Sequence, residues 1–140
     1  MSLLRGLVRN RTETDPFAAD RRLRGRTYAI TFERVWTAAV ALCGGALPRW
    51  SLLCANDQAG IIRAQALTRV FRRPHDIEIR IRLDENGQTR VDVASVLLNS
   101  GRDLGANARR IAAFLNGLDA QLGATGDQIL DATRAPQFTA

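Results

Sequence analysis

Residues 104–122 carry the most regular hydrophobic pattern of the chain. Apolar side chains recur there at alternating steps of four and three residues, which places them on one face of an α-helix. Asp103 can accept a hydrogen bond from the unpaired amides of the first turn, and Gly123 follows the last apolar residue, so both helix ends are marked. The pattern predicts an amphipathic helix that packs on a partner surface. Its apolar face consists of Leu104, Ala108, Ile111, Leu115, Leu118 and Leu122.

A second helix is predicted near the start of the folded part. Residues 27–31 alternate between polar and apolar and predict a first strand, and residues 32–47 then carry apolar side chains at helical spacing. Thr31 stands where its side chain would cap this helix. The glycine pair 44–45 weakens the last turn, so we expect the helix to end near there.

Two stretches on either side of a turn-forming cluster predict a β-hairpin. Residues 50–54 and 61–71 are β-prone and flank the sequence Asn-Asp-Gln-Ala-Gly. The register that sets Cys54 opposite Ile62 also sets large residues against small ones on the core side, with Trp50 facing Ala66. This register predicts that Cys54 lies in the core.

A second hairpin follows, in which isoleucines and valines alternate with charged residues. Only an odd number of loop residues keeps the apolar side chains of both strands on one face of the sheet. A three-residue loop with Gly87 in the left-handed conformation meets this condition. It predicts two cross-strand pairs, Leu83 with Val91 on the core side and Arg82 with Asp92 outside.

These elements predict the α+β class: a five-stranded, mostly antiparallel sheet with two helices on one face, in the chain order β-α-β-β-β-β-α. We expect a basic N-terminal arm over residues 1–26, the α+β domain over residues 27–122 and a C-terminal tail over residues 123–140. A capping-box pattern at 125–128 predicts a short helical turn in that tail.

Composition excludes several chemistries. The chain has 140 residues and a net charge of +6. All its basic residues are arginine, which excludes a Schiff-base lysine, a phosphate-loop lysine and a serine–lysine pair. No apolar stretch reaches the length of a membrane-spanning helix and no secretory signal is present, so we expect a cytoplasmic protein. Seven of the arginines lie in residues 1–26.

The residue types that perform catalysis are few and scattered. Cys43 and Cys54 fall in apolar stretches, and together with His75 they do not make up a zinc ligand set. His75 follows a proline turn signal, so we expect a surface turn histidine. Asp76 and Glu78 share a strand face with two arginines, which favours charge balancing over acid–base catalysis. We therefore expect no enzyme, no metal and no cofactor.

Several segments carry a family resemblance. Residues 28–36, 60–64 and 90–93, and above all the helical motif Asp-Leu-Gly-x-Asn-Ala-x-Arg-Ile at 103–111, resemble a bacterial family, the domain of unknown function family numbered 1499, over about residues 27–122. The resemblance implies no established activity. We expect the motif to hold the connection before the helix by hydrogen bonds, with binding of a ligand anion as the alternative. The motif residues concerned are Asp103, Gly105, Asn107 and Arg110.

The departures from the family pattern suggest a partner surface. The pattern has polar residues in the last strand where this chain has Ala94, Leu97 and Leu98, and an apolar patch there usually meets another protein. The N-terminal arm combines apolar residues with arginines, as docking segments do. The expected partner-binding residues are Leu3, Leu4, Arg5, Leu7, Arg9 and Arg11 of the arm, together with Leu97 and Leu98.

We therefore expect a non-catalytic interaction protein, an accessory or structural subunit that docks on a larger protein assembly. The alternative is a binding module for a small apolar or lipid-like ligand held between sheet and helices. Residues 1–11 would also suit an anionic membrane surface, which would place the protein at the periphery of the inner membrane. Nucleic acid is not an expected partner, because the predicted sheet offers no aromatic stacking platform.

Overall fold

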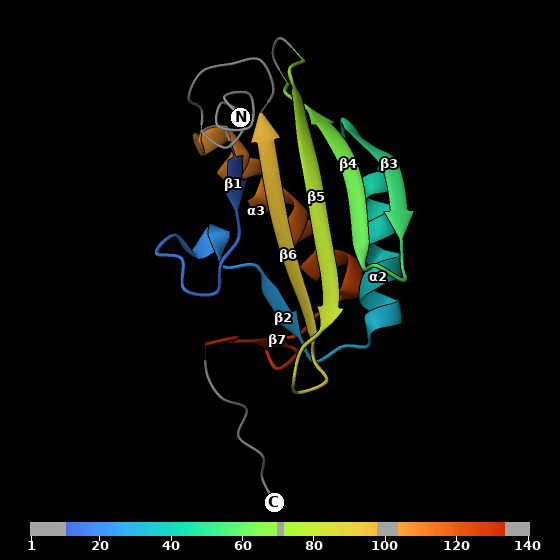
Figure 1. Cartoon of the computed structure of the whole chain (residues 1–140), viewed down its shortest axis with the longest axis vertical. Helices are drawn as coiled ribbons and strands as arrows, with labels where there is room; N and C mark the ends of the chain where they lie inside the picture. Colours follow the sequence, from blue (N-terminus) through green and yellow to red (C-terminus); the bar gives the residue numbers. More distant parts are fainter. Residues whose placement is uncertain (1–10, 70–71, 98–103, 134–140) are drawn as a thin grey trace, which may run out of the picture.

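An antiparallel sheet carries two helices on one of its faces in the computed structural model, which describes residues 11–69, 72–97 and 104–133 (Figure 1). The strands are hydrogen-bonded in the order β3-β4-β5-β6-β2-β7, and β1 pairs with the remaining part of β6. The predicted α+β class is confirmed, with seven strands instead of five. The elements are β1 (Arg11–Glu13), the 3₁₀ turn η1 (Arg21–Leu23), β2 (Arg26–Tyr28), α2 (Phe32–Ala41), the π-helical turn η2 (Leu42–Ala46), β3 (Trp50–Asn56), β4 (Ile61–Leu67), β5 (Pro74–Leu83), β6 (Thr89–Leu97), α3 (Leu104–Leu122) and β7 (Ile129–Leu130).

The two additional strands come from the segments expected to be an arm and a tail. β6 is nine residues long, and β2 pairs only with its first part. β1 pairs with the second part of the same edge of β6, where Arg11 lies opposite Val96. A basic, polar segment thus joins the sheet because its backbone satisfies the free edge of β6. The arm expected over residues 1–26 is therefore part of the fold from residue 11 onward.

The C-terminal segment forms the expected turn but then continues into the sheet. The Thr125 amide donates to the Gln128 side chain at 3.0 Å, and the Ile129 amide donates to the Thr125 carbonyl at 3.3 Å. The Gln128 carbonyl accepts from Ala29, and β7 then pairs with β2. The helical turn does not continue, because the chain enters the strand pairing of β7 directly after it.

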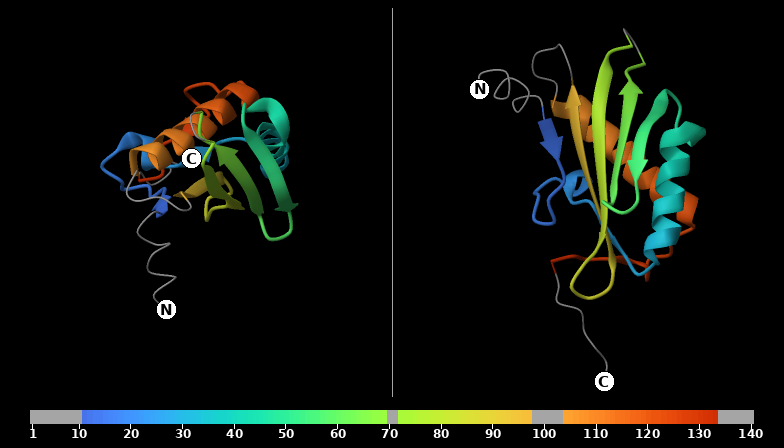
Figure 2. Two further views of the ribbon diagram at one scale, coloured as in Figure 1. Left: turned by 90° about the horizontal axis from the view of Figure 1, so that it is seen from above. Right: turned by 45° about the vertical axis from the view of Figure 1, so that its right-hand side comes forward.

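The core lies between the helices and the face of the sheet that they cover (Figure 2). α3 begins and ends at the residues that the periodicity predicts. Trp50 of β3 stacks on Phe114 of α3 with ring centroids 5.7 Å apart. The strands contribute the alternate residues Ile62, Ala64, Ala66, Ile77, Ile79, Ile81, Val91 and Val93, and the helices contribute Val35, Ala38, Ala39, Ile111, Phe114, Leu115, Leu118 and Leu122.

The second helix differs in detail from the prediction. α2 ends at Ala41, and the chain continues through the π-helical turn η2 to Ala46. Gly45 has a φ of 147°, which a residue with a side chain rarely adopts, so the glycine pair unwinds the end of the helix. The prediction for Thr31 was wrong, because its side chain makes no capping hydrogen bond.

The first hairpin contains a β-bulge that the sequence did not reveal. Trp50 lies opposite Ala66 as predicted, but the register shifts between Leu52 and Cys54. The extra residue moves Cys54 to the opposite sheet face, where it pairs with Arg63 and its thiol is exposed. The predicted core position of Cys54 was therefore wrong.

The second hairpin has the predicted parity and a three-residue loop, residues 85–87, in which Gly87 is left-handed with a φ of 74°. The Asp84 amide closes the loop by donating to the Gln88 carbonyl at 2.8 Å, and the Asp84 carboxylate accepts from the amides of Asn86 and Gln88 at 2.9 Å. The register differs from the prediction, because Leu83 pairs with Thr89 and not with Val91. The expected pair of Arg82 with Asp92 is absent: Arg82 lies opposite Arg90 and Arg80 opposite Asp92.

Cys43 makes the stability of this fold sensitive to alkaline pH. Burial raises the pKa of the Cys43 thiol from 9.0 to about 12, whereas an unfolded chain ionises near 9.0. Stability should thus be full below pH 9 and fall as the pH rises toward 12, by about 1.4 kcal/mol per unit from this one group. Urea unfolding of the wild type and of Cys43→Ala between these pH values tests this: the two profiles should diverge with rising pH, and parallel profiles would contradict the burial effect.

Candidate functional site

Three polar residues meet in the core at the end of α3 that carries the family motif. Asn107 of α3, His75 of β5 and Ser95 of β6 are all fully buried. The Ser95 hydroxyl donates to the side-chain oxygen of Asn107 at 2.8 Å, and His75 Nδ1 lies 2.9 Å from the same oxygen. His75 donates there in the tautomer that carries its proton on Nδ1. One amide oxygen therefore joins the helix to two strands.

This cluster does not have the geometry of a nucleophilic site. A serine nucleophile donates its proton to the base, but Ser95 donates to Asn107 and lies 3.5 Å from His75 Nδ1. Its oxygen is also closed off from solvent. The arrangement fixes the packing of the sheet against α3.

The prediction of a surface histidine was wrong, and the strand parity explains why. His75 is two residues before Ile77 and therefore on the same face of β5 as the core isoleucines. The preceding proline is the first residue of β5 rather than the end of a turn. Extending the alternation of the strand by one step would have predicted a buried His75.

A second, partly buried polar contact joins β2 to the C-terminal part of α3. The Tyr28 hydroxyl donates to Asp119, and the Arg26 guanidinium donates to both oxygens of that carboxylate at 3.1 Å. Asn116, one turn earlier, accepts from Arg26. Burial, reinforced by the hydrogen bond to Asp119, raises the pKa of Tyr28. The phenol remains a neutral hydrogen-bond donor here, which suits a structural role.

A third polar contact holds the chain before β2 against β6. Arg90 is almost fully buried and donates to both carboxylate oxygens of Asp92, at 3.2 and 2.7 Å. It also donates to the Arg24 carbonyl at 2.7 Å. Asp92 accepts in turn from the hydroxyl of Thr14, which itself accepts from the Val93 amide. The segment after β1 is thereby bound to the sheet.

The remaining candidate for a functional surface is the sheet face opposite the helices, which we call the outer face. No helix of the described chain covers it (Figure 2). A hollow of about 410 Å³ lies where β1 meets β5 and β6 on this face. It is lined by Arg11, Glu13, Thr14, Glu78, Arg80, Arg82, Asp92, Val93 and Ala94.

The outer face carries exposed arginines that its carboxylates neutralise only in part. Arg63 and Arg80 share the single carboxylate of Glu78, at 3.6 and 3.4 Å, and both guanidinium side chains are more than half exposed. Arg82 lies opposite Arg90 and forms no ion pair with any residue that the structure describes. This arrangement attracts a negatively charged group.

The expected partner-binding residues are only partly placed. Arg11 begins β1, pairs with Glu13 at 3.2 Å and lines the hollow. Leu97 ends β6, where its backbone lies opposite His75. The other six, Leu3, Leu4, Arg5, Leu7, Arg9 and Leu98, lie outside the described residues, as does Asp103 of the motif.

The other motif residues occupy the start of α3 with different surroundings. Gly105 is exposed, Asn107 is buried and Arg110 is half-buried. Burial lowers the pKa of the Arg110 guanidinium, and the nearby charges of Arg49 and Arg109 lower it further. Asn107 forms hydrogen bonds with Ser95 of β6 and His75 of β5, so it ties the start of α3 to these two strands.

Removing residues 2–15 tests whether β1 belongs to the fold. The deletion takes away the β1–β6 pairing and the two side-chain hydrogen bonds of Thr14, so the free energy of unfolding should fall by about 2–4 kcal/mol. The deletion of residues 2–10 retains β1 and should leave stability within about 0.5 kcal/mol. Urea melts of both proteins measure the difference. Equal stabilities would show that residues 11–15 do not contribute to the folded unit.

None of the helices in the described residues combines the length and the hydrophobicity that a membrane-spanning helix needs. No three or more histidine, cysteine or acidic side chains of the described ranges lie close enough together to hold a metal ion.

The fold and the uncovered outer face define a small α+β domain whose buried polar side chains hold its helices and strands together. The sequence profile of a family described as "Protein of unknown function (DUF1499)" matches residues 10–118, and the chain belongs to this family. The predicted resemblance is thereby confirmed, and the match includes β1, which the predicted range omitted. No curated protein matches the chain.

Proposed function

We propose that the protein is a non-catalytic interaction protein, an accessory subunit that docks on a larger protein assembly through its outer face and its N-terminal residues. The observation that carries the proposal is a sheet face that no helix of the described residues covers, on which Arg82 forms no ion pair and Arg63 and Arg80 share one carboxylate. His75 and Ser95, by contrast, are buried in contacts that hold α3 against β5 and β6.

The N-terminal residues join the fold at this face. Residues 1–10 precede Arg11, which lines the hollow. A ten-residue segment reaches up to about 33 Å, so its leucines and arginines are within range of whatever lies on the outer face. Apolar anchors surrounded by charge are typical of docking segments, because the charge speeds encounter and the anchors slow release.

The partner that fits best is a protein with an acidic surface. Arg82 and the partly neutralised pair Arg63 and Arg80 would each gain a carboxylate, and Ala94 offers a small apolar floor in the hollow. We assume a cytoplasmic setting, with the inner-membrane periphery as the alternative if residues 1–11 contact anionic lipid.

The alternative function, binding of a small apolar ligand between sheet and helices, has less support. The small residue Ala66 lies opposite Trp50, and Trp50 stacks on Phe114 in the space that a ligand would need. The hollow of the outer face is lined mainly by charged side chains, which do not favour an apolar ligand.

Photo-cross-linking in the source cells tests the docking face. A photoreactive benzoylphenylalanine at Arg82 should give a heavier adduct with another protein, whereas the same residue at Thr37, exposed on α2, should not. Both sites are solvent-exposed, so the comparison is matched for folding. An adduct from Thr37 but not from Arg82 would move the docking site to the helical side, and no adduct from either would contradict the proposal.

A further inference from the structure

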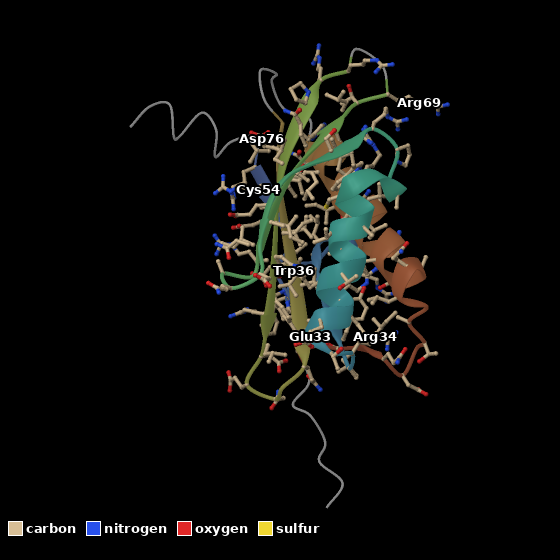
Figure 3. All side chains as sticks on the ribbon, turned by 90° about the vertical axis from the view of Figure 1, so that its right-hand side faces the viewer. Glu33, Arg34, Trp36, Cys54, Arg69 and Asp76 are labelled. Carbon is tan, nitrogen blue, oxygen red and sulfur yellow. The ribbon has the colours of Figure 1, made fainter. Side chains whose placement is uncertain are left out.

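β3 forms one edge of the sheet, and among the described residues it has a strand partner on one side only. Six of its seven residues are exposed, including Leu52 at 37% and Leu53 at 58%. Its sequence, Trp-Ser-Leu-Leu-Cys-Ala-Asn, contains no charge and no proline. Figure 3 views this edge, with Cys54 on the side of the sheet away from α2. A long, uncharged edge strand is a template for pairing with another strand.

Two opposite charges flank this strand: Arg49, which has a left-handed backbone with a φ of 66°, directly precedes it, and Asp57 begins the turn that follows it. Arg49 is four residues before Leu53 and Asp57 is four residues after it. Both side chains are exposed, and neither forms an ion pair with another described residue. The edge is therefore neutral along its length, basic at its start and acidic at its end.

We infer that β3 pairs antiparallel with β3 of a second copy of the chain, across a twofold axis at Leu53. In an antiparallel pair centred there, Arg49 of each copy faces Asp57 of the other, and the two Leu53 side chains meet on the axis. Such an interface is isologous, so every favourable contact occurs twice. A parallel arrangement in the same register would instead bring the two Arg49 side chains together.

The bulge fits this arrangement. It lies between Leu52 and Cys54 and so coincides with the axis. Pairing would run as two equivalent segments on either side of the two facing bulges, while Leu52 and Leu53 lose contact with water. The inference goes beyond the proposed docking function, because β3 is the edge of the sheet furthest from β1 and the hollow.

A charge-swap series tests the register in purified full-length protein. Sedimentation velocity over a range of protein concentrations should show a species of twice the 15.4 kDa chain mass for the wild type. Arg49→Asp and Asp57→Arg should each weaken the dimer by about tenfold or more, because each places like charges opposite one another twice. The double variant Arg49→Asp/Asp57→Arg should restore the dimer, and thermal melts of all four proteins check that the fold is unchanged.

A disulfide test locates the axis independently. In a Cys54→Ser background, Leu53→Cys should give a disulfide-linked dimer on mild oxidation, and Gln121→Cys on α3 should not. A wild type that stays monomeric at the highest soluble concentration would overturn the inference and assign the bulge the opposite role, that of closing the edge. A double swap that fails to restore the dimer would overturn it as well, since the two charges would then not face each other.

Discussion

Gly60→Ala should lower the free energy of unfolding by about 2–5 kcal/mol. Gly60 is left-handed, with a φ of 70°, at the turn that leads into β4. A Cβ atom added there would lie 2.2 Å from the Ile81 carbonyl oxygen, which is backbone and cannot rotate away. The Gly60 carbonyl also accepts from the Ile81 amide at 2.8 Å, so relieving the clash would break the start of the β4–β5 ladder.

Gly87→Ala is the matched control for this prediction. Gly87 is also left-handed, with a φ of 74°, but a Cβ there would meet nothing within 4 Å. Only the backbone strain applies, so the loss should be about 1–2 kcal/mol. Urea unfolding of both variants measures the difference, and equal losses would show that β5 does not approach Gly60 as closely as the structure has it.

Asn107→Ala should lower the free energy of unfolding by about 2–5 kcal/mol, the second large effect. The substitution removes the oxygen that Ser95 and His75 share, and it leaves both buried donors without that acceptor. An unsatisfied buried polar group destabilises by about 1–3 kcal/mol, and the substitution removes one hydrogen bond from each of two buried side chains. Chemical denaturation followed by tryptophan fluorescence provides the value.

A double-mutant cycle separates this loss from the effect of shortening a side chain. Ser95→Ala removes one of the two donors, so the double variant with Asn107→Ala should lose less than the sum of the single changes. Gln121→Ala, exposed on the same helix, should change stability by less than about 0.5 kcal/mol. Additive losses at 95 and 107 would contradict the shared hydrogen bond.

The regular parts of the fold could be predicted because one residue period dominates each of them. α3 has the predicted boundaries, and the isoleucines of β5 face the core as their alternation predicts. The predictions failed where a single extra residue shifts the alternation of side chains along a strand. The bulge at Leu53 places Cys54 on the outer face. The residue pattern of one strand does not reveal a bulge, because the extra residue is defined only by the pairing with the partner strand.

The residues of the candidate site were harder to predict from the sequence. β1 and β7 belong to the sheet because free edges of β6 and β2 accept their backbones, and such pairing has no side-chain pattern. The buried clusters of Asn107 and of Asp119 depend on contacts between residues far apart in the chain. The outer face, in contrast, followed from the strand alternation, which sets Glu78, Arg80 and Arg82 on one side.

The most direct test of the docking proposal is the native mass of the full-length protein isolated from its source cells, with and without Arg80→Glu/Arg82→Glu. The wild type should be recovered in a complex that contains a different protein, and the complex should dissociate as salt rises. The charge-reversed variant should lose that protein, while Arg21→Glu, exposed on η1, should retain it. Recovery of the wild type only as one or two copies of the 15.4 kDa chain at every salt concentration would contradict the proposed function.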